Sequence, residues 1–216
     1  MSLKACDETC ALCHGEGWID MGAGLALCPN DPRKFNGTGV EPSDAEIIKE
    51  LPETGALKRI QAEGETLFKN GFGLLYLCGP FGIGKSVCVK FWTVQAVEKY
   101  KDALYIRQSK MINYLRESFS GDDKQAEYSR RLEKLCSVRW LVIDEVGRDR
   151  TTDFAVEVMN EIVDARYQGA LRKKTTTVLV SNFEPEKVFD AYIVDRIRDV
   201  KNKVLIIQGK SLRGAK

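Results

Sequence analysis

The residues best suited to chemistry lie between positions 79 and 86, where the sequence reads GPFGIGKS. This glycine-rich segment follows a short apolar run at residues 74 to 77 and precedes a segment with the apolar pattern of a buried helix. Glycines let backbone N–H groups approach phosphate oxygens closely, and a helix N-terminus adds its positive dipole end. The pattern predicts a loop that binds a nucleoside triphosphate, formed by Gly79, Pro80, Phe81, Gly82, Ile83, Gly84, Lys85, Ser86 and Val87. Within it, we expect Lys85 to neutralise the β- and γ-phosphates and the Ser86 hydroxyl to bind Mg²⁺.

An acidic pair ends a second buried strand. Residues 140 to 143 are apolar, and Asp144 and Glu145 follow directly. Open α/β sheets bind ligands at the carboxyl ends of their strands, so this pair should lie near the phosphates. We expect Asp144 to hold Mg²⁺ through its water shell and Glu145 to act as general base for an attacking water. Because adjacent residues of a strand point to opposite faces, only one of the two is expected to face the metal directly.

A third polar position follows the strand predicted at residues 176 to 180. If its neighbouring strands bear the phosphate loop and the acidic pair, Asn182 can orient the attacking water or contact the γ-phosphate. A Ser-Asn pair is also ordinary in a turn, and this alternative stays open.

Composition limits the class of protein. The 216 residues, 44% hydrophobic and 30% charged, can form one sizeable α/β core and a small appendage. No long apolar span or signal-peptide pattern is visible, so we expect a cytoplasmic protein that does not associate with membranes.

The net charge of +2 is unevenly distributed. Residues 1 to 55 carry four Lys or Arg against ten Asp or Glu, and residues 56 to 216 carry 29 against 21. An acidic N-terminal region suits a protein partner. The basic remainder, with clusters at residues 166 to 174 and 196 to 216, suits nucleic-acid phosphates, although each cluster can equally be a solvated surface.

Four of the seven cysteines lie in the first 28 residues. Cys10 and Cys13 form a Cys-x-x-Cys pair, and Cys28 follows after a gap long enough for a hairpin. So short a segment cannot bury enough apolar surface to fold alone, and a reducing compartment disfavours disulfides. We therefore predict a zinc site, with Cys6 favoured over His14 as fourth ligand because His14 adjoins Cys13; a flexible tail with reduced thiols is the alternative. The other cysteines are expected to be small core residues: Cys78, Cys88 and Cys136.

The chain divides into three predicted parts. Residues 1 to 45 form a cysteine-rich head, residues 46 to 70 a linker and lead-in helix, and residues 71 to 216 the triphosphate-binding domain. Four of the six prolines lie between residues 29 and 55, which indicates a loosely packed connection. Strands and helices then alternate, which predicts a three-layer α/β fold with a parallel sheet. The predicted strands are 74–77, 103–107, 139–144, 176–180 and 204–207, and the predicted helices are 56–70, one beginning near Lys85, 109–118, 122–136 and one with Asp153 as N-cap.

Taken together, several segments resemble the DnaC/DnaI/IstB group of AAA+ ATPases, the replicative helicase loaders and their transposition relatives. These segments are GPFGIGKS, LVIDEVGR, EIVDARYQ, VLVSNF, DRIR and GKSLRG. The resemblance covers residues 65 to 216, and the head is similar to the cysteine-rich N-termini of loaders in bacteria and phages. The resemblance implies an AAA+ core that binds ATP and Mg²⁺ and that has a reduced lid.

The resemblance also implies roles that the bare motifs do not. Asn182 matches the first sensor, Arg213 the second sensor, and Arg196 the arginine finger offered to the nucleotide of a neighbouring subunit, with Arg198 as the competing candidate. A finger supplied in trans makes activity depend on self-association. The stretch from 109 to 119 is implied to lie near single-stranded DNA, with candidate contacts from Tyr114, Arg116 and Phe119.

Two features depart from the family pattern. The usual loader head ends in Cys-x-Cys, whereas Cys28 is followed by Pro29 and Asn30, so zinc binding depends on Cys6. The chain also ends about nine residues after its last predicted strand, which leaves little room for a helical lid over Arg213.

These observations predict an ATPase that binds the replicative DNA helicase through its head and single-stranded DNA through its basic body. Three alternatives remain: an IstB-like transposition helper that binds duplex DNA and a transposase, a nucleotide-binding adaptor without significant turnover, and a small-molecule kinase. The cysteine-rich head favours the loader over the helper, and the acidic pair favours turnover. Asn182 and Arg196 disfavour the kinase.

Overall fold

Five parallel strands form the central sheet. The computed structural model describes residues 18–20, 25–27, 32–120, 123–148 and 152–213. The sheet has the order β4-β5-β6-β3-β7, and every neighbouring pair is parallel. Its strands are β3 (Gly73–Cys78), β4 (Ala103–Arg107), β5 (Trp140–Val146), β6 (Thr176–Ser181) and β7 (Lys203–Ile206). The predicted parallel α/β sheet is therefore confirmed, and each strand lies within two residues of its expected bounds.

The strand order explains how distant motifs meet. β6 lies between β3, which leads into the phosphate-binding loop, and β5, which carries the acidic pair. Because all the strands run in parallel, their carboxyl ends meet at one edge of the sheet. Loop, acidic pair and Asn182 are thereby brought to the same edge.

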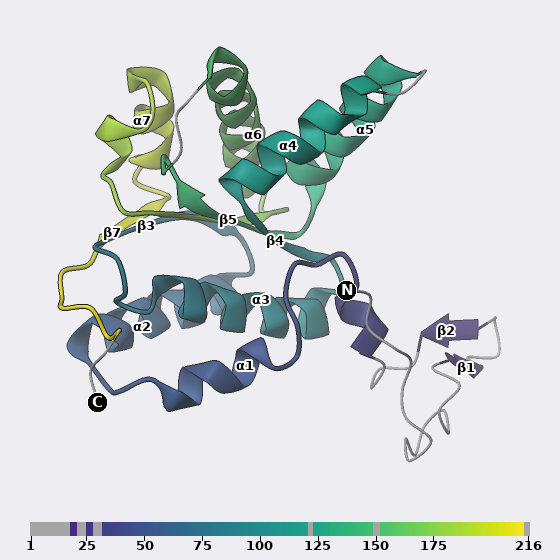
Figure 1. Ribbon diagram of the computed structural model, residues 1–216. Helices are drawn as coiled ribbons and strands as arrows, with labels where there is room; N and C mark the ends of the chain where they lie inside the picture. The colour runs from purple at the N-terminus through teal and green to yellow at the C-terminus, as the bar shows by residue number, and fades with distance from the viewer. Residues whose placement is uncertain (1–17, 21–24, 28–31, 121–122, 149–151, 214–216) are drawn as a thin grey trace.

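Helices cover both faces of the sheet (Figure 1). One face carries α1 (Asp44–Ile47), α2 (Gly55–Asn70) and α3 (Lys85–Tyr100), and the other carries α4 (Gln108–Glu117), α5 (Lys124–Ser137), α6 (Asp153–Leu171) and α7 (Ala191–Ile197). The short 3-10 helices are η1 (Pro32–Phe35), η2 (Ile48–Glu50), η3 (Ser118–Ser120) and η4 (Pro185–Lys187). Two further strands, β1 (Trp18–Asp20) and β2 (Leu25–Leu27), pair antiparallel. Of the helices in the described residues, none has the length and hydrophobicity needed to span a bilayer.

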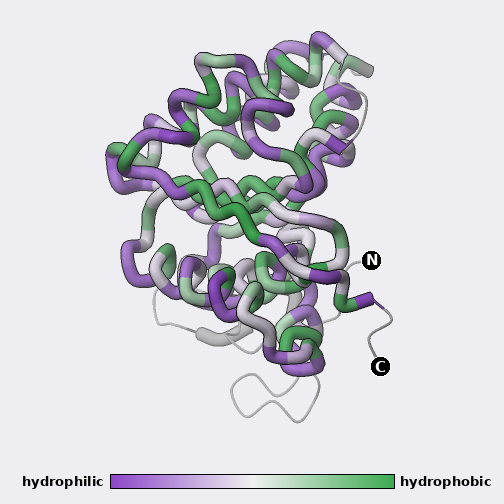
Figure 2. Tube along the Cα trace, turned by 90° about the vertical axis from the view of Figure 1, so that its left-hand side faces the viewer, coloured by the Kyte–Doolittle hydropathy of each residue, from purple (hydrophilic) through white to green (hydrophobic). Residues whose placement is uncertain are grey.

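Side-chain alternation on the strands divides the core into two layers. On β3, Leu75 and Leu77 belong to the cluster that includes α2 and α3, while Leu74 and Tyr76 pack with α6 and α7 on the opposite face. Burial on both faces accounts for the uninterrupted apolar runs of the strands. In Figure 2 the sheet crosses the middle of the molecule as a largely hydrophobic band between the helical layers.

Helix α6 contains a completely buried arginine. Arg166 donates from Nε to Thr177 Oγ1 at 2.8 Å, and burial lowers its pKa to about 9. Its terminal nitrogens donate to the carbonyl oxygens of Cys136, Val138 and Thr176. The guanidinium thus joins α6 to the end of α5 and to β6. The expectation of a basic surface at 166–174 is therefore wrong for Arg166, whose hydrogen-bonding capacity is used inside the fold.

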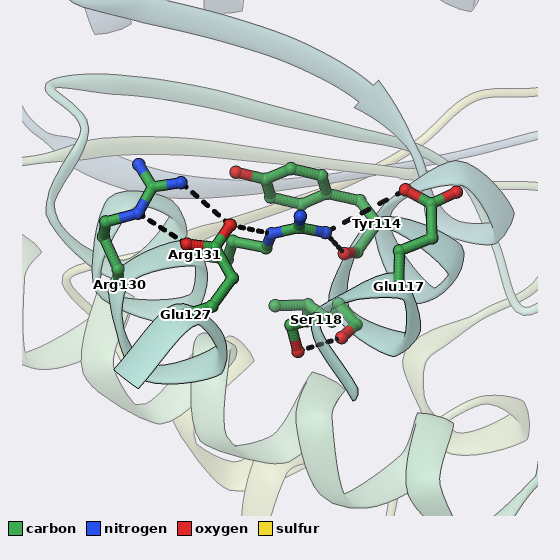
Figure 3. A network of polar contacts seen from close by, with 7 residues as sticks. Tyr114, Glu117, Ser118, Glu127, Arg130 and Arg131 are labelled. Atoms are coloured by element: carbon green, nitrogen blue, oxygen red, sulfur yellow. Dashed lines mark hydrogen bonds and ion pairs between the residues drawn. The ribbon is translucent and has the colours of Figure 1, made fainter. Parts of the chain in front are cut away.

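A polar network braces α4 against α5 (Figure 3). Glu127 accepts hydrogen bonds from Arg130 at 2.8 and 2.9 Å and from Arg131 at 2.5 Å, and these bonds lower the pKa of Glu127 to about 2. Arg131 also donates to the Tyr114 carbonyl, and its guanidinium lies 4.5 Å from the centroid of the Tyr114 ring. Arg131 therefore links the second helix of this pair to the first.

Side-chain hydrogen bonds cap the N-termini of three α-helices: α2, α6 and α7. Thr54 accepts from Leu57 N at 3.2 Å at the start of α2. The N-cap of α6 is Thr152, not Asp153 as predicted, because the threonine hydroxyl accepts the Ala155 N–H at 3.3 Å. Asp153 lies in the first turn, where an acidic side chain is favoured by the helix dipole.

Residues 34 to 51, here called the N-terminal arm, pack against the core. Phe35 and Val40 are buried in the cluster that contains α3, and Asp44 forms a 2.8 Å ion pair with Lys90 of that helix. The expectation of a loose connection is wrong for the arm, since its one proline and its glycines lie in turns and bends between short helices that pack against the core. The head boundary at residue 45 stays a prediction.

The close approach of α2 to α3 generates a stability prediction. A Cβ added to Gly64 would lie 2.1 Å from the Trp92 ring, whereas one added to Gly55, at the start of the same helix, would meet nothing within 4 Å. We expect Gly64→Ala to lower the free energy of unfolding by about 1–3 kcal/mol, because the buried indole must shift. Gly55→Ala should change it by less than about 1 kcal/mol. Urea unfolding of both variants provides the comparison, and equal effects would contradict the packing.

Candidate nucleotide-binding site

A cavity of about 260 Å³ opens at the carboxyl ends of β3, β5 and β6. Of the predicted residues, those that line it are Phe81, Gly82, Gly84, Lys85, Ser86, Val87, Asp144, Glu145, Asn182 and Arg213. Gly79 and Pro80 contribute their carbonyl oxygens to Lys85, and Ile83 is buried beneath the loop. The tertiary structure thus brings the three predicted motifs into one cavity.

The loop has a conformation that requires glycine. Gly82 and Gly84 have φ angles of +79° and +93°, in the left-handed region. Ile83 lies between them and anchors the loop in the core. Helix α3 begins at Lys85, directly after the loop, so its first N–H groups, which have no partner within the helix, are at the cavity.

Oxygen atoms surround the Lys85 ammonium. Nζ donates to the Gly79 carbonyl at 2.6 Å, the Pro80 carbonyl at 2.8 Å and Asn182 Oδ1 at 2.9 Å. Burial lowers the pKa of Lys85 to about 8, and the negative charge of Asp144 opposes this shift. The side chain is therefore cationic at neutral pH, held between the loop and the end of β6.

Asp144 is held by both of its carboxylate oxygens. Only 2% of the residue is exposed; Oδ2 accepts from the Tyr105 hydroxyl at 2.7 Å and Oδ1 accepts from Glu145 N at 2.7 Å. Burial, followed by the charge of Asp144, raises the pKa of Tyr105, so this phenol keeps its proton and acts as a donor. The carboxylate is consequently fixed in orientation by groups from β4 and β5.

Glu145 departs from the extended conformation of β5. Its φ is +59°, and the β5–β6 register shifts between Ile143 and Val146. A non-glycine residue in this region stores roughly 1–3 kcal/mol of backbone strain, which proteins concentrate at functional sites. The carboxylate pairs with Arg148 at 2.6 Å and lies 4.0 Å from Arg107 Nε. Both acids line the same cavity, and the regular alternation of the strand ends at Glu145. The expectation that only one of them faces the metal directly stays a prediction.

A second cavity of about 230 Å³ adjoins the first. Ser86, Asp144 and Glu145 line both. The Ser86 hydroxyl and the Asp144 carboxylate supply hard oxygen donors of the kind that Mg²⁺ prefers. These side chains therefore fit the predicted magnesium ion.

The C-terminal segment crosses the phosphate-binding loop. Ile207 N donates to the Cys78 carbonyl at 2.8 Å, and Leu212 N donates to the Gly82 carbonyl at 2.9 Å. A Cβ on Gly82 would lie 2.1 Å from Ser211 Oγ, so glycine permits this crossing. An extended segment, rather than a helical lid, thereby brings Arg213 to the cavity.

The two candidate arginine fingers are not among the described residues that line either cavity. Arg196 of α7 forms an ion pair with Asp164 of α6, and its guanidinium lies 3.5 Å from the Tyr192 ring centroid. Arg198 pairs with Glu186.

The candidate DNA-contacting residues make contacts within the chain. Arg131 covers the Tyr114 ring, and Arg116 donates to the N-cap hydroxyl of α6 at 2.8 Å. Phe119 stacks on Tyr128 with ring centroids 5.3 Å apart and keeps an exposed ring. Of these aromatic rings, Phe119 is therefore the better placed for a stacking contact.

The predicted zinc ligands Cys6, Cys10, Cys13 and Cys28 lie outside the described residues, and the zinc site stays a prediction. Strands β1 and β2 pair within the sequence between the third and fourth of the expected positions, where a hairpin was predicted. In the part of the chain that the structure describes, no group of three or more His, Cys, Asp or Glu side chains could hold a metal ion. Cys78 and Cys88 are buried and Cys136 is half-buried. Burial raises the pKa of Cys88 to about 12 and that of Cys136 to about 11, which disfavours the reactive thiolate form.

Sequence reasoning missed three polar side chains of the site. Tyr105 and Arg107 come from β4, and Arg148 comes from the turn after β5. Arg107 is paired in register with Asp144. The sequence did contain a signal for Arg107, since the predicted strand 103–107 ends in this charged residue. Neighbouring parallel strands end at the same edge of the sheet, so this end could have been assigned to the site.

Comparisons with known proteins agree with this fold. Residues 61–215 match the family model described as IstB-like ATP binding protein. A comparison with curated protein sequences found no match. The fold is similar to that of AMPPCP-bound DnaA from Aquifex aeolicus, with a TM-score of 0.63 and 15% sequence identity. The match covers 78% of this chain and 50% of the DnaA chain.

Two further solved structures are similar in fold. The DnaC helicase loader is 20% identical over 72% of this chain and 92% of that chain, with a TM-score of 0.57. DnaI is 19% identical over 72% of this chain and 86% of that chain, with a TM-score of 0.56. This chain therefore spans about half the length of the DnaA chain but most of the length of the other two.

The position of Lys85 leads to a binding prediction. We expect Lys85→Met to weaken the affinity for a fluorescent ATP analogue by about 10- to 100-fold, because hydrogen bonds to charged groups contribute about 1.5–3 kcal/mol. Lys58→Met is the matched control, since Lys58 is exposed and pairs with Glu53 on the surface. Thermal melts first establish that both variants are folded. Fluorescence titration then measures the affinity of each for the ATP analogue. Unchanged affinity of Lys85→Met would exclude this cavity as the phosphate site.

Proposed function

The chain belongs to the IstB-like ATP-binding protein family, and from this membership we propose that it is an ATPase that loads the replicative DNA helicase. One observation carries the ATPase proposal: Lys85, the acidic pair and Asn182 line one cavity at the strand ends. The similarity in fold to a DnaC helicase loader and to DnaI supports the choice of loader.

The side chains divide the proposed reaction between them. Lys85 binds the β- and γ-phosphate oxygens, which replace some of its hydrogen bonds to the Gly79 and Pro80 carbonyls. Ser86 and Asp144 hold Mg²⁺. When bound, Mg²⁺ neutralises phosphate charge. Glu145 orients the attacking water and accepts its proton, which requires its carboxylate to be released from Arg148. Asn182 contacts the γ-phosphate, and Arg213 reaches the nucleotide from the C-terminal segment.

We propose that Arg196 completes this site in a neighbouring subunit. It lies on α7, pairs with Asp164 of α6, and is not among the described residues that line the cavity of its own chain. A residue that serves the adjoining protomer is expected to have such a position. Self-association is then required for full turnover.

The proposed partners follow the charge distribution. The acidic region, residues 1 to 55, would bind the helicase, with Zn²⁺ held by Cys6, Cys10, Cys13 and Cys28. The basic body would bind single-stranded DNA through phosphate contacts and a stacking contact from Phe119.

A transposition helper of the IstB kind is the second candidate, favoured by the description of the matching family. It would act on duplex DNA. The two candidates therefore differ in the nucleic acid that should stimulate hydrolysis.

ATP hydrolysis with different nucleic acids tests the function directly. We expect the full chain to hydrolyse ATP and single-stranded DNA to raise the rate more than duplex DNA of equal length. Glu145→Gln should bind ATP and reduce turnover by about 100-fold or more, because it removes the general base. Glu133→Gln, a change on the exposed surface of α5, is the matched control.

The outcomes separate the proposals. Greater stimulation by duplex DNA favours the transposition helper. ATP binding without turnover under all of these conditions favours the adaptor. Normal hydrolysis by Glu145→Gln would contradict the assignment of the base.

The proposed role of Arg196 in a neighbouring subunit leads to a separate prediction. Arg196→Ala should retain ATP binding and lose most assembly-dependent turnover, on the order of a thousandfold. Mixing it with Lys85→Met subunits should restore part of the activity, because each variant supplies what the other lacks. The same experiment with Arg198→Ala tests the competing arginine. No recovery in the Arg196 mixture would contradict its role across the interface.

A further inference from the structure

The N-terminal arm contacts the backbone of Tyr105 on β4. Tyr105 N donates to the Thr38 carbonyl at 2.7 Å. A Cβ on Gly39 would lie only 1.9 Å from the Tyr105 carbonyl oxygen, and Gly39 has a φ of +79°. The arm therefore lies directly against this residue, at a position where only glycine allows the approach.

The side chain of Tyr105 has a second link to the arm. Lys90 Nζ lies 2.8 Å from Asp44 Oδ1 and 5.5 Å from the centroid of the Tyr105 ring. Asp44 is only 8% exposed, and its other oxygen accepts from Glu41 N at 2.9 Å. Lys90 thus joins a buried carboxylate of the arm to the phenol ring on β4.

The phenol in turn holds Asp144. The Tyr105 hydroxyl donates to Asp144 Oδ2 at 2.7 Å. The cavity of about 230 Å³ has Asp44 and Ile47 of the arm on its wall together with Ser86 and Asp144. A continuous series of contacts therefore runs from the arm to the carboxylate that fits Mg²⁺.

We propose that Tyr105 is a positioning residue for Asp144 and that the arm, acting through Lys90 and Tyr105, sets the affinity of the nucleotide site for Mg²⁺. The proposal rests on the proposed function, in which Asp144 holds the metal. Groups that hydrogen-bond to a metal ligand typically change metal affinity by about 10- to 100-fold when they are removed. Since the arm is part of the acidic region, residues 1 to 55, that is proposed to bind the helicase, partner binding would reach the metal site by this route.

Removal of one hydroxyl tests the positioning role. The full chain is titrated with Mg²⁺ while the affinity for a fluorescent ADP analogue is measured, with Tyr105→Phe compared with wild type. We expect about a tenfold higher Mg²⁺ concentration at the midpoint for Tyr105→Phe, and unchanged ADP affinity in EDTA. Tyr100→Phe is the matched control, because the buried Tyr100 hydroxyl has no hydrogen-bond partner among the described residues.

Removal of one charge tests the link to the arm. Lys90→Met should raise the Mg²⁺ midpoint in the same direction, and its effect should largely disappear in the Tyr105→Phe background, because both act through one hydroxyl. Lys99→Met is the control on the same helix: Lys99 lies 4.9 Å from the Tyr100 ring and has no contact with this series. Fully additive effects of Lys90→Met and Tyr105→Phe would overturn the link through Tyr105.

Coupling between two sites is reciprocal, so Mg²⁺ must also stabilise the arm. Hydrogen–deuterium exchange of ADP-bound protein should show slower exchange at the amides of Glu41, Asp44 and Ala45 when Mg²⁺ is added, in wild type but not in Tyr105→Phe. This readout does not depend on hydrolysis.

The outcomes distinguish this inference from the function on which it rests. Absence of ADP binding, or of any Mg²⁺ effect, in wild type would overturn the proposed function. Wild-type binding that Mg²⁺ strengthens, combined with an unchanged Tyr105→Phe midpoint, would overturn the positioning role alone. A variant that only melts at a lower temperature, with the wild-type Mg²⁺ midpoint, would show that Tyr105 is merely structural.

Discussion

The structure depends on keeping a charged ammonium group in place at Lys85, which is 7% exposed. A buried cation is tolerated only when oxygen atoms surround it, because its hydration must be replaced. Here two acceptors are carbonyl oxygens of the loop, and the third is Oδ1 of Asn182, which follows β6. The parallel order of β5, β6 and β3 is what allows this third contact. Satisfying one cation therefore ties the loop to the centre of the sheet.

The two acids beside this cation are held in opposite ways. Asp144 accepts hydrogen bonds at both oxygens and is nearly buried, as suits a ligand that must keep one orientation. Glu145 has a left-handed backbone and an ion pair with Arg148, an exchangeable partner near solvent. These differences match the tasks proposed for the two acids. Asp144 is rigidly supported, as a metal ligand should be, and Glu145 has a contact that it can release in order to act as a base.

Two segments outside the sheet also border the site, one from the N-terminal part of the chain and one from the C-terminal part. The arm contacts β4 and α3 from the N-terminal side, and the segment after β7 crosses the loop from the C-terminal side. Both approaches require glycine: a side chain at Gly39 of the arm would overlap the Tyr105 carbonyl on β4, and one at Gly82 of the loop would overlap Ser211 of the C-terminal segment. The site is therefore bordered by the short helices and turns of the arm on one side and by an extended segment on the other.

The sequence alone determined the elements and most of the site. Apolar runs of strand length located the sheet, and polar residues after two of the runs identified Lys85 and Asp144, because parallel strands place their carboxyl ends together. At the end of a third run, Asn182 was open between a turn residue and a site residue, and family resemblance favoured the site. Family resemblance pointed to Arg213, which the structure brings to the cavity by an extended crossing that no local pattern encodes. Capping at Thr152 rather than Asp153 is within the ordinary error of helix boundaries.

Only the tertiary structure decided which side chains support those residues. Tyr105 and Arg107 enter the site because β4 is the neighbour of β5, and a one-dimensional pattern cannot specify strand order. Arg166 belongs to a basic cluster in the sequence but is buried by the packing of α6 against β6. Glu145 shares a cavity with Asp144 because a local register shift overrides strand alternation. In each case contacts between residues distant in sequence decide the outcome, whereas local periodicity records only which face of its own element a residue occupies.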